Sequence, residues 1–360
     1  MMTLGVSVIV AARNAEATIA KAVRSALAQP AVSEVIVVDD VSTDRTAAAA
    51  SRADDGSGRL KILTAPANLG PAGARNLALE RSAAPYFCVL DADDYMLPGR
   101  LTKLLASANG DWDLIADDII ILPQSSGLTF SLRRDAYSLR HLDLESFALG
   151  NISRPGRPRG ELGFLKPVVS RAFMYRNDLR YDESLRLGED YAFYLRALLG
   201  GARFALVSAC GYVAVERHDS LSSNHSGEDL RRIMMFDEAI LSLYPDLKPG
   251  ERAALAKHRD ATWRKHVHAE ALDLKREKGI AQALAFLGRA PAALPHVLAE
   301  TVRAKSKGML HRLLPPPSRD SRRLRLLMGL PGARLADIRP AGQSGELAFD
   351  AALRSDRPAA

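Results

Sequence analysis

The sequence predicts an α/β fold with a mostly parallel central sheet, and two observations support this prediction. Strand-like and helix-like segments alternate four times within about 90 residues, which is typical of βαβ crossovers. Two of the strand-like segments end directly on acidic residues, Asp39-Asp40 and Asp91-Ala92-Asp93. Because open α/β sheets bind ligands at the carboxyl ends of their strands, we expect both acidic groups at one ligand-binding edge.

The strand-like segments are short and rich in apolar, β-branched residues, as expected for strands that are covered on both faces. Apolar residues recur at helical spacing between them, and Asn14 and Ser42 are candidate N-caps of the first two helices. Pro71 suits the first turn of the third helix. The predicted strands span residues 4–12, 34–38, 59–64, 86–90, 114–122 and 128–132, and a further one ends at 213–216.

The composition is that of an ordinary globular protein with one large or two average domains. The 360 residues are 47% hydrophobic and 25% charged. The two cysteines, Cys88 and Cys210, exclude a disulfide framework and lack the spacing of a metal site. No basic segment precedes the first apolar run, and no uncharged apolar run approaches the roughly 18 residues of a spanning helix. We therefore expect a cytosolic protein.

Asp91 and Asp93 follow the fourth strand and are candidate metal ligands. Only Ala92 separates them, so their carboxylates can share one hard divalent cation, which can in turn hold phosphate oxygens. Aspartate is also common in turns after strands, and this simpler interpretation stays open. A second Asp-x-Asp, Asp111-Trp112-Asp113, precedes an apolar run instead of following one, so we interpret it as a turn.

Four motifs occur in order within the first part of the chain, and no P-loop or Gly-x-Gly-x-x-Gly accompanies them. They are Val-Ser-Val-Ile-Val-Ala-Ala-Arg-Asn (6–14), Val-Val-Asp-Asp-Val-Ser-Thr-Asp (37–44), Asn-Leu-Gly-Pro-Ala-Gly-Ala-Arg-Asn (68–76) and Leu-Asp-Ala-Asp-Asp (90–94). Together they resemble the motifs of family 2 inverting glycosyltransferases. The resemblance implies the GT-A fold, with a Rossmann-like, mostly parallel central sheet flanked by helices. It also implies a nucleotide-diphospho-sugar donor, Mg²⁺ or Mn²⁺, and an inverting displacement.

The first two motifs carry the nucleoside-binding residues that this resemblance implies. Asp39 resembles the aspartate that contacts uracil, with Asp40 next to it. Ala11 and Arg13 resemble the residues beside the nucleoside. The family commonly has glycine after the second aspartate, whereas this chain has Val41, so the resemblance does not define the geometry of this turn.

The later motifs resemble the part of the family site that holds the diphosphate. Arg75 resembles a residue near the donor phosphates or sugar. Asp91 and Asp93, with Ala92 between them, resemble the Asp-x-Asp that holds ribose and metal. His218 lies in a stretch that resembles the closing His-x-x-Ser near the diphosphate, where it would bind metal or phosphate. A surface or core histidine is the alternative.

Glu189 and Asp190 stand at the start of a predicted helix and are the candidate catalytic carboxylates. The helix dipole also stabilises acidic residues there, which explains many such pairs without catalysis. Inverting transfer needs a carboxylate that takes the proton of the acceptor hydroxyl, and in the family a Glu-Asp pair supplies it. We assign Asp190 as the base and Glu189 as its support. Lys166 resembles the start of acceptor-side structure, and a loop entering a strand explains it equally well.

After about residue 226 the pattern becomes helical and basic. We predict a catalytic domain over 1–230, a helical basic extension over 231–330 and a flexible tail over 331–360. Residues 303–325 hold eight Lys/Arg and one acidic residue, which equals the net charge of +7 of the whole chain. Basic and apolar residues alternate there, so an anionic membrane surface is the expected partner, with a solvated basic face as the alternative. Aromatic residues for base stacking are absent, so we expect no nucleic-acid partner.

The combined prediction is a glycosyltransferase that moves a hexose, glucose first, from a UDP-sugar to a hydroxyl of a glycan acceptor. The layout is similar to that of bacterial glucosyltransferases that extend lipid-linked exopolysaccharide repeat units, including those of succinoglycan. A cytoplasmic protein, peripheral on the inner face of the cell membrane, is therefore expected. One rival is a sugar-nucleotide nucleotidyltransferase, which would usually have a Gly-rich basic loop after the first strand. The other is a non-catalytic sugar-nucleotide-binding protein, which would lose the base.

Overall fold

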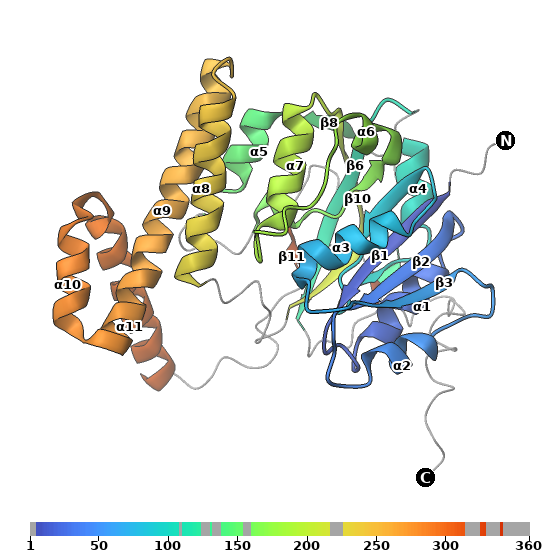
Figure 1. Cartoon of the computed structure of the whole chain (residues 1–360), viewed down its shortest axis with the longest axis horizontal. Helices are drawn as coiled ribbons and strands as arrows, with labels where there is room; N and C mark the ends of the chain where they lie inside the picture. The colour runs from blue at the N-terminus through green and yellow to red at the C-terminus, as the bar shows by residue number, and fades with distance from the viewer. Residues whose placement is uncertain are drawn as a thin grey trace, which may run out of the picture.

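A computed structural model gives the fold and describes residues 5–107, 110–123, 130–131, 138–153, 160–216, 226–313, 325–328 and 339–340. Its centre is a mixed, mostly parallel sheet with helices packed on it, and long helices stand at one side (Figure 1). This confirms the predicted α/β fold class. The strands of this sheet are β1 (Val6–Ala12), β2 (Val32–Asp39), β3 (Leu60–Thr64), β4 (Tyr86–Val89), β5 (Tyr95–Met96), β6 (Leu114–Pro123), β8 (Leu139–Leu142), β9 (Val168–Ser170), β10 (Phe204–Glu216) and β11 (Arg325–Leu326).

The first half of the sheet is formed by β1 to β4, which are the four strands that the motifs flank. All of them run parallel, in the order β3-β2-β1-β4. The crossovers contain α1 (Ile19–Leu27), α2 (Thr46–Ser51) and α3 (Gly70–Glu80), and Pro71 stands in the first turn of α3 as predicted. Every residue of β2 except one is buried, in agreement with a strand that is covered on both faces.

The second half of the sheet continues through β9, which is antiparallel to both β4 and β6 and joins the two halves. Next to it, β6 and β10 run parallel over most of their length. The helices of this half are α4 (Arg100–Ser107), α5 (Leu144–Gly150), α6 (Arg171–Arg176) and α7 (Glu189–Leu199), with the short turn η1 (Leu162–Phe164). A separate pair of short strands, β7 (Phe130–Ser131) and β12 (Arg339–Pro340), lies off the main sheet.

The two predicted N-caps are wrong. Asn14 and Ser42 bind each other's loops instead: Ser42 Oγ accepts from the Asn14 amide at 2.9 Å, and Asn14 Oδ1 accepts from the Thr43 amide at 2.8 Å. The helices begin later, at Ile19 and Thr46. The physical reason is that β1 and β2 end side by side, so polar side chains in one loop reach amides of the other before either helix starts.

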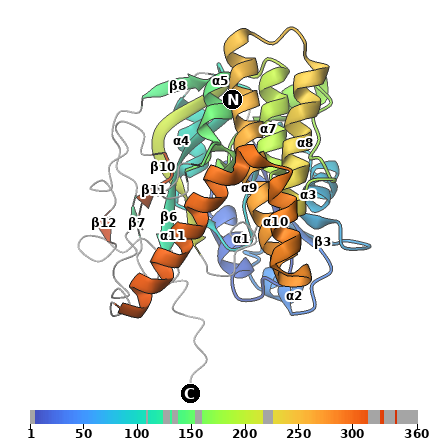
Figure 2. The ribbon, with the colours of Figure 1, turned by 90° about the vertical axis from the view of Figure 1, so that its left-hand side faces the viewer.

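The C-terminal helices are α8 (Gly227–Leu243), α9 (Pro249–Lys278), α10 (Ile280–Gly288) and α11 (Leu294–Leu313), with the turn η3 (Pro291–Ala293) before α11. α8 and α9 pack side by side, and α9 also contacts α5. α10 and α11 form the outer end of the molecule, and Figure 2 shows both in front of α9. Among the described residues, no helix combines the length and the apolar composition needed to cross a membrane.

The chain after α11 returns to the sheet, which corrects the prediction of a helical extension up to residue 330. Arg325 and Leu326 form β11, which pairs with Ile120 and Ile121 of β6, and Leu327 is buried in the core. The reason is that β9 pairs with only the first two residues of β6 and leaves the rest of that edge open. The predicted flexible tail lies outside the described residues, apart from Arg339 and Pro340 of β12.

Candidate functional site

The predicted acidic residues meet at the carboxyl edge of the parallel strands, as expected. Ala12 of β1 lies opposite Asp39 of β2, and Ile9 of β1 lies opposite Val89 of β4. The chain therefore leaves β4 for Asp91 close to the place where β1 and β2 end. Sequence spacing alone was sufficient to place these groups together.

The predicted nucleoside residues line this edge, and Asp40 has a structural task there. Its carboxylate accepts hydrogen bonds from the amides of Leu69 at 2.7 Å and of Gly70 at 2.9 Å, at the start of α3. Asp40 therefore positions the helix that carries Arg75. Asp39 is also buried, and its Oδ1 accepts from the Ser42 amide at 3.1 Å.

The remaining predicted nucleoside residues are more open to solvent. Ala11 is half-buried and Arg13 is exposed. Val41, the departure from the family motif, has a φ of 56° and is 41% exposed. A β-branched residue is unfavourable in this left-handed region, which a glycine adopts readily. Val41 thus keeps the turn conformation that the family's glycine would allow, at a cost in backbone strain.

Five charged side chains form a cluster that joins the two halves of the sheet. Arg75 of α3 contacts three carboxylates: its Nη2 lies 3.1 Å from Asp91 Oδ1, its Nη1 lies 3.1 Å from Asp190 Oδ1, and Nη1 also binds Glu189 Oε1. Lys166 Nζ lies 2.9 Å from Asp91 Oδ2 and 2.7 Å from Asp190 Oδ2. Asp91 and Asp190 are therefore each held by both cations. We call these five residues the ion cluster.

The ion cluster is largely shielded from water, which strengthens its charge interactions. Arg75, Lys166, Glu189 and Asp190 are buried, whereas the Asp91 side chain remains 33% exposed. The cluster contains three carboxylates and two cations, so a further positive charge, or loss of a carboxylate charge, would neutralise it. Its open side is at Asp91, where the parallel strands end.

The pKa values follow from burial and from these partners. Burial opposes ionisation of Asp91, but Lys166 and Arg75 outweigh it and lower its pKa. Burial raises the pKa of Glu189, and the contact with Arg75 offsets this only in part. Burial works against the Lys166 ammonium, yet the carboxylates of Asp190 and Asp91 raise its pKa. Asp91 and Lys166 are therefore ionised at neutral pH.

Helix α7, which carries Glu189 and Asp190, begins at a position that favours glycine. Gly188, its N-cap residue, has a φ of 82°, and an added Cβ would lie 2.8 Å from Ile233 Cδ1 of α8. Glu189 and Asp190 follow directly in the first turn, where the helix dipole favours negative charge. Packing between α7 and α8 therefore sets the position of both carboxylates.

A second, fully buried ion pair, Arg100–Asp117, fixes the backbone at Lys166. The Lys166 carbonyl accepts from Arg100 Nη2 at 2.5 Å, and Arg100 Nη2 lies 2.7 Å from Asp117 Oδ1. Asp117 also accepts from the Gly211 amide at 2.6 Å. Because Arg100 and Asp117 are each 1% exposed, the backbone at Lys166 is firmly positioned. Arg100 and Asp117 were not predicted, since they lie in segments that read only as helix and strand.

The Asp91 main chain is held in a similar way by Tyr212 of β10. The Tyr212 hydroxyl accepts from the Asp91 amide at 3.1 Å and donates to Asp94 Oδ2 at 2.8 Å. Burial raises the pKa of Asp94, and the nearby Asp91 and Asp93 add to this. Asp94 could have been predicted as a site residue, because it directly follows the Asp-x-Asp. Tyr212 could not, because it lies within an apolar run that gives no sign of such a role.

The residues present fit a divalent cation in part. Carboxylate oxygens suit Mg²⁺ and Mn²⁺, and Mg²⁺ sites commonly combine one or two carboxylates with substrate phosphates. Both Asp91 oxygens, however, are engaged by Arg75 and Lys166. Asp93 and Ala92 beside it are half-buried at the open side. Within the described residues, no group of three metal-ligating side chains is present, and His218 lies outside them.

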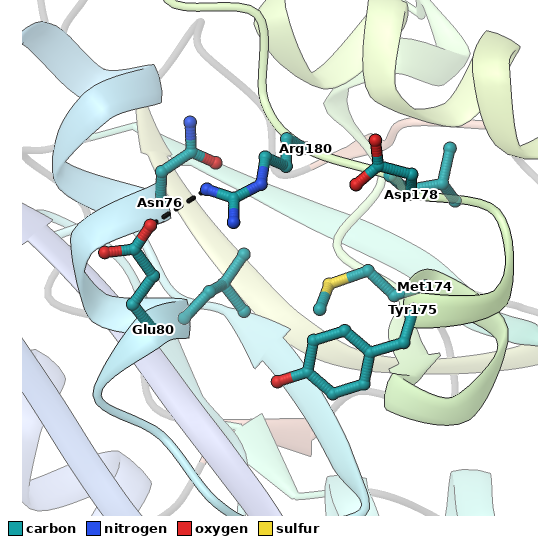
Figure 3. A pocket seen from close by; sticks show the side chains of 8 residues that line it. Asn76, Glu80, Met174, Tyr175, Asp178 and Arg180 are labelled. Carbon is teal, nitrogen blue, oxygen red and sulfur yellow. Dashed lines mark hydrogen bonds and ion pairs between the residues drawn. The ribbon is translucent and has the colours of Figure 1, made fainter.

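A small pocket elsewhere is not the donor site. It lies between α3 and α6, and the Glu80–Arg180 ion pair of 2.8 Å borders it (Figure 3). Its volume of about 70 Å³ is far below the roughly 300–1,000 Å³ of ligand pockets. None of the predicted site residues lines it.

The second Asp-x-Asp, Asp111-Trp112-Asp113, has a structural role, as predicted. Asp113 pairs with Arg203 at 3.0 Å just before β6.

Comparison with known proteins gives the family of this chain. Residues 7–173 match the family "Glycosyl transferase family 2". The chain is 46% identical over 295 residues to succinoglycan biosynthesis protein ExoU of Rhizobium meliloti (strain 1021), which covers 81% of this chain and 85% of that protein. It is 34% identical over 242 residues to succinoglycan biosynthesis protein ExoO of the same organism, which covers 66% of this chain and 68% of that protein.

A solved structure shares the fold. S. aureus TarS 1–349 in complex with UDP-GlcNAc superimposes with a TM-score of 0.57 at 20% identity, over 80% of this chain and 92% of that one. Together with the family match and the similarity to ExoU, this supports the GT-A-like architecture expected from the motifs. The chain is thus an enzyme of glycosyl transferase family 2, a glycosyltransferase related to ExoU.

Proposed function

We propose that this enzyme transfers a hexose, glucose first, from a UDP-sugar to a hydroxyl of a glycan acceptor, with inversion. The observation that carries the proposal is the ion cluster, in which Arg75 and Lys166 join the donor-side Asp91 to the acceptor-side Asp190. The names of the relatives ExoU and ExoO support succinoglycan-type exopolysaccharide synthesis as the context. A lipid-linked repeat unit is the acceptor that we infer.

The donor would bind along the carboxyl edge of the sheet. In this proposal Asp39 contacts uracil, with Ala11 and Arg13 beside the nucleoside, and the diphosphate reaches the open side of the ion cluster. Arg75 and Lys166 would offset most of the negative charge of the three carboxylates, so that less of it opposes the charge that develops on the departing UDP. When bound, Mg²⁺ or Mn²⁺ would add to this neutralisation, with Asp93 as its candidate ligand and His218 as a second one.

Asp190 would act as the base of a single displacement. The acceptor oxygen attacks the anomeric carbon, the bond from that carbon to the UDP oxygen breaks, and the hydroxyl proton passes to a carboxylate. Asp190 is ordered for this task by Lys166 at 2.7 Å and by Arg75 at 3.1 Å. Glu189 shares the Arg75 guanidinium and supports the orientation of Asp190.

A cytoplasmic enzyme on the inner face of the cell membrane fits a lipid-linked acceptor. The excess of Lys/Arg over residues 303–325 supports attraction to an anionic surface. Residues 314–324 of that segment lie outside the described residues. Contact with a membrane therefore also requires a suitable surface within the described part of the chain.

The test of the proposed function is a donor-hydrolysis screen of UDP- and GDP-sugars, with and without Mg²⁺ or Mn²⁺. We expect release of UDP from UDP-glucose first, and dependence on the cation. Asp190→Asn is the variant that should bind donor but fail to transfer, and Asp111→Asn, an exposed aspartate in the second Asp-x-Asp, is the matched control. Release of GDP but not UDP would contradict the donor assignment.

A further inference from the structure

Helix α10 is apolar on all sides, and yet it lies on the surface. Its sequence, Ile-Ala-Gln-Ala-Leu-Ala-Phe-Leu-Gly, has no charged residue. Only Ala283 is buried, whereas Ile280 is 62% and Leu284 is 61% exposed. Helices of this composition are normally buried in a protein core or in a membrane. Something other than the described residues is therefore expected to cover α10.

Helix α11 also exposes apolar residues. Val297 packs toward Val267 of α9, so one side of α11 faces the protein. Leu294, Leu298 and Val302 recur at intervals of four residues on another side, and all are exposed. α10 and α11, joined by η3, form the outer end of the molecule, away from the sheet (Figures 1 and 2). We call Ile280, Leu284, Leu294, Leu298 and Val302 the outer apolar face.

The sequence that follows this face is basic, and its first basic residue, Arg303, pairs with Glu300. Residues 303–313 of α11 contain four Lys/Arg and no Asp or Glu. Apolar side chains beside a group of basic residues are the composition of interfacial helices that bind anionic lipid. Two copies of this chain joined through this face would instead bring their basic residues together, which opposes self-association.

Leu326 and Leu327, which follow the basic segment, cannot take this role. Leu326 pairs in β11 and Leu327 is buried in the core, so neither is free to contact lipid. The outer apolar face, in contrast, is exposed and lies just before the basic segment in sequence.

We propose that the outer apolar face inserts into the interface of an anionic bilayer and docks the enzyme there. This deepens the proposed function, because it rests on a lipid-linked acceptor as the reason for a membrane location. Two contributions then act together. Basic residues attract the protein to the anionic surface in a salt-dependent way, and the apolar residues hold it there after salt has screened the charges.

The experiment is co-sedimentation of the full chain with vesicles of phosphatidylcholine and phosphatidylglycerol (3:1), at low and at 0.5 M NaCl. We expect the wild type to bind at both salt concentrations. The variant Ile280→Ser/Leu284→Ser/Leu298→Ser should bind at least about tenfold more weakly, with the larger loss at high salt. The matched control Tyr175→Ser/Leu243→Ser removes two exposed apolar residues far from this face and should bind like the wild type.

A second readout keeps the proposal testable if the triple variant binds poorly because it is misfolded. Leu298→Trp should show a blue-shifted fluorescence change on adding the vesicles, whereas Leu243→Trp should not. Equal binding by the wild type and the triple variant, without a shift for Leu298→Trp, would overturn the proposal. So would a dimer in sedimentation velocity that the triple variant abolishes, because a second copy would then cover the face.

The same samples separate this proposal from the proposed function. Hydrolysis of UDP-sugar without lipid should be unchanged in the triple variant, since its residues are far from the ion cluster. Vesicle binding by a wild type that hydrolyses no UDP-sugar would leave the docking surface supported and contradict the donor assignment. If the wild type hydrolyses UDP-sugar but does not bind the vesicles, the donor assignment is supported and the docking surface is contradicted.

Discussion

The Tyr191 hydroxyl donates a hydrogen bond to the Asp237 carboxylate, with 2.7 Å between Tyr191 Oη and Asp237 Oδ1. Tyr191 follows Asp190 on α7, and Asp237 lies fully buried on α8. His258 of α9 lies 2.7 Å from the other Asp237 oxygen through its Nδ1. Helices from beyond the predicted boundary at residue 230 thus hold the helix that presents Glu189 and Asp190.

Removing the Asp237 carboxylate should loosen α7, the helix that carries Glu189 and Asp190. Asp237→Ala leaves the Tyr191 hydroxyl and the His258 ring without their shared partner, so the free energy of unfolding should fall by about 2–3 kcal/mol. Urea unfolding measures this loss. Glu238→Ala is the control, because its exposed pair with Arg259 contributes less than about 1 kcal/mol. Equal losses in both variants would show that the buried network does not stabilise α7.

Metal-dependent donor binding should require Asp93. Asp93→Ala should weaken UDP binding in saturating Mn²⁺ by about tenfold or more, because loss of a ligand costs at least as much as loss of an outer partner. Without metal, the two proteins should bind UDP alike. Isothermal titration with and without Mn²⁺ measures both values, with Asp111→Ala as the control. Equal affinity of wild type and Asp93→Ala in saturating Mn²⁺ would exclude Asp93 as a ligand.

Asp190→Asn should separate binding from transfer. The amide keeps the shape of the carboxylate but cannot take the proton, so the transfer rate should fall by at least about 100-fold. UDP-sugar affinity should stay within a few-fold, and Glu189→Gln should cost less. Steady-state transfer and donor titration give the two quantities. If Glu189→Gln is the more damaging change, Glu189 is the base, and its raised pKa would favour that assignment.

Lys166→Met should destabilise the fold in a pH-dependent way. The change leaves Asp91 and Asp190 with one cation fewer, and the free energy of unfolding should fall by about 3 kcal/mol at neutral pH. Lys166 helps to lower the pKa of Asp91, so this contribution is present above the ordinary aspartate pKa and is lost as pH falls through the lowered one. The difference between wild type and variant should therefore shrink below about pH 4.

The control for Lys166→Met is Arg180→Met, which breaks an exposed ion pair with Glu80. It should cost less than about 1 kcal/mol at every pH. Chemical denaturation at a series of pH values measures both variants. A difference for Lys166→Met that stays constant down to pH 2 would show that packing of the side chain, and not its charge, stabilises the site.

Val41→Gly should be tolerated or stabilising. The left-handed conformation costs a residue with a Cβ about 1–2 kcal/mol, and the extra freedom of glycine in the unfolded chain costs about 0.5–1 kcal/mol. The free energy of unfolding should therefore rise by up to about 1 kcal/mol, as thermal unfolding would show. Val41→Ala keeps a Cβ and should give no gain. A gain for Val41→Ala as large as for Val41→Gly would mean that backbone strain is not the cause.

The parts of the fold that the sequence predicted are those encoded in short contiguous segments. The parallel strands, the acidic residues that follow them and the start of α3 at Pro71 depend on neighbours in sequence, so their patterns are visible. The N-caps at Asn14 and Ser42 were wrong because each side chain binds an amide in the other loop. Local propensity contains no information on such partners.

The acidic residues of the candidate site were predictable from the sequence, but the contacts that hold them together were not, for the same reason. Asp91 follows a strand, but Lys166 belongs to the site because Arg100 and Asp117, from two other elements, hold its carbonyl. Tyr212 contacts the Asp91 amide from the middle of an apolar strand. Contacts between distant segments decide these roles, and no spacing in one sequence reveals them.

The ion cluster has a consequence for recombining this enzyme with its relatives. Arg75 and Asp91 come from the first half of the catalytic fold, and Lys166 and Asp190 come from the second. A chimera with its junction between residues 97 and 160 would take the two halves of the cluster from different parents. Swapping one half of the catalytic fold between relatives, in order to exchange acceptor specificity, is therefore restricted to parents that both carry this arrangement of charges. High overall similarity between the parents does not replace this requirement.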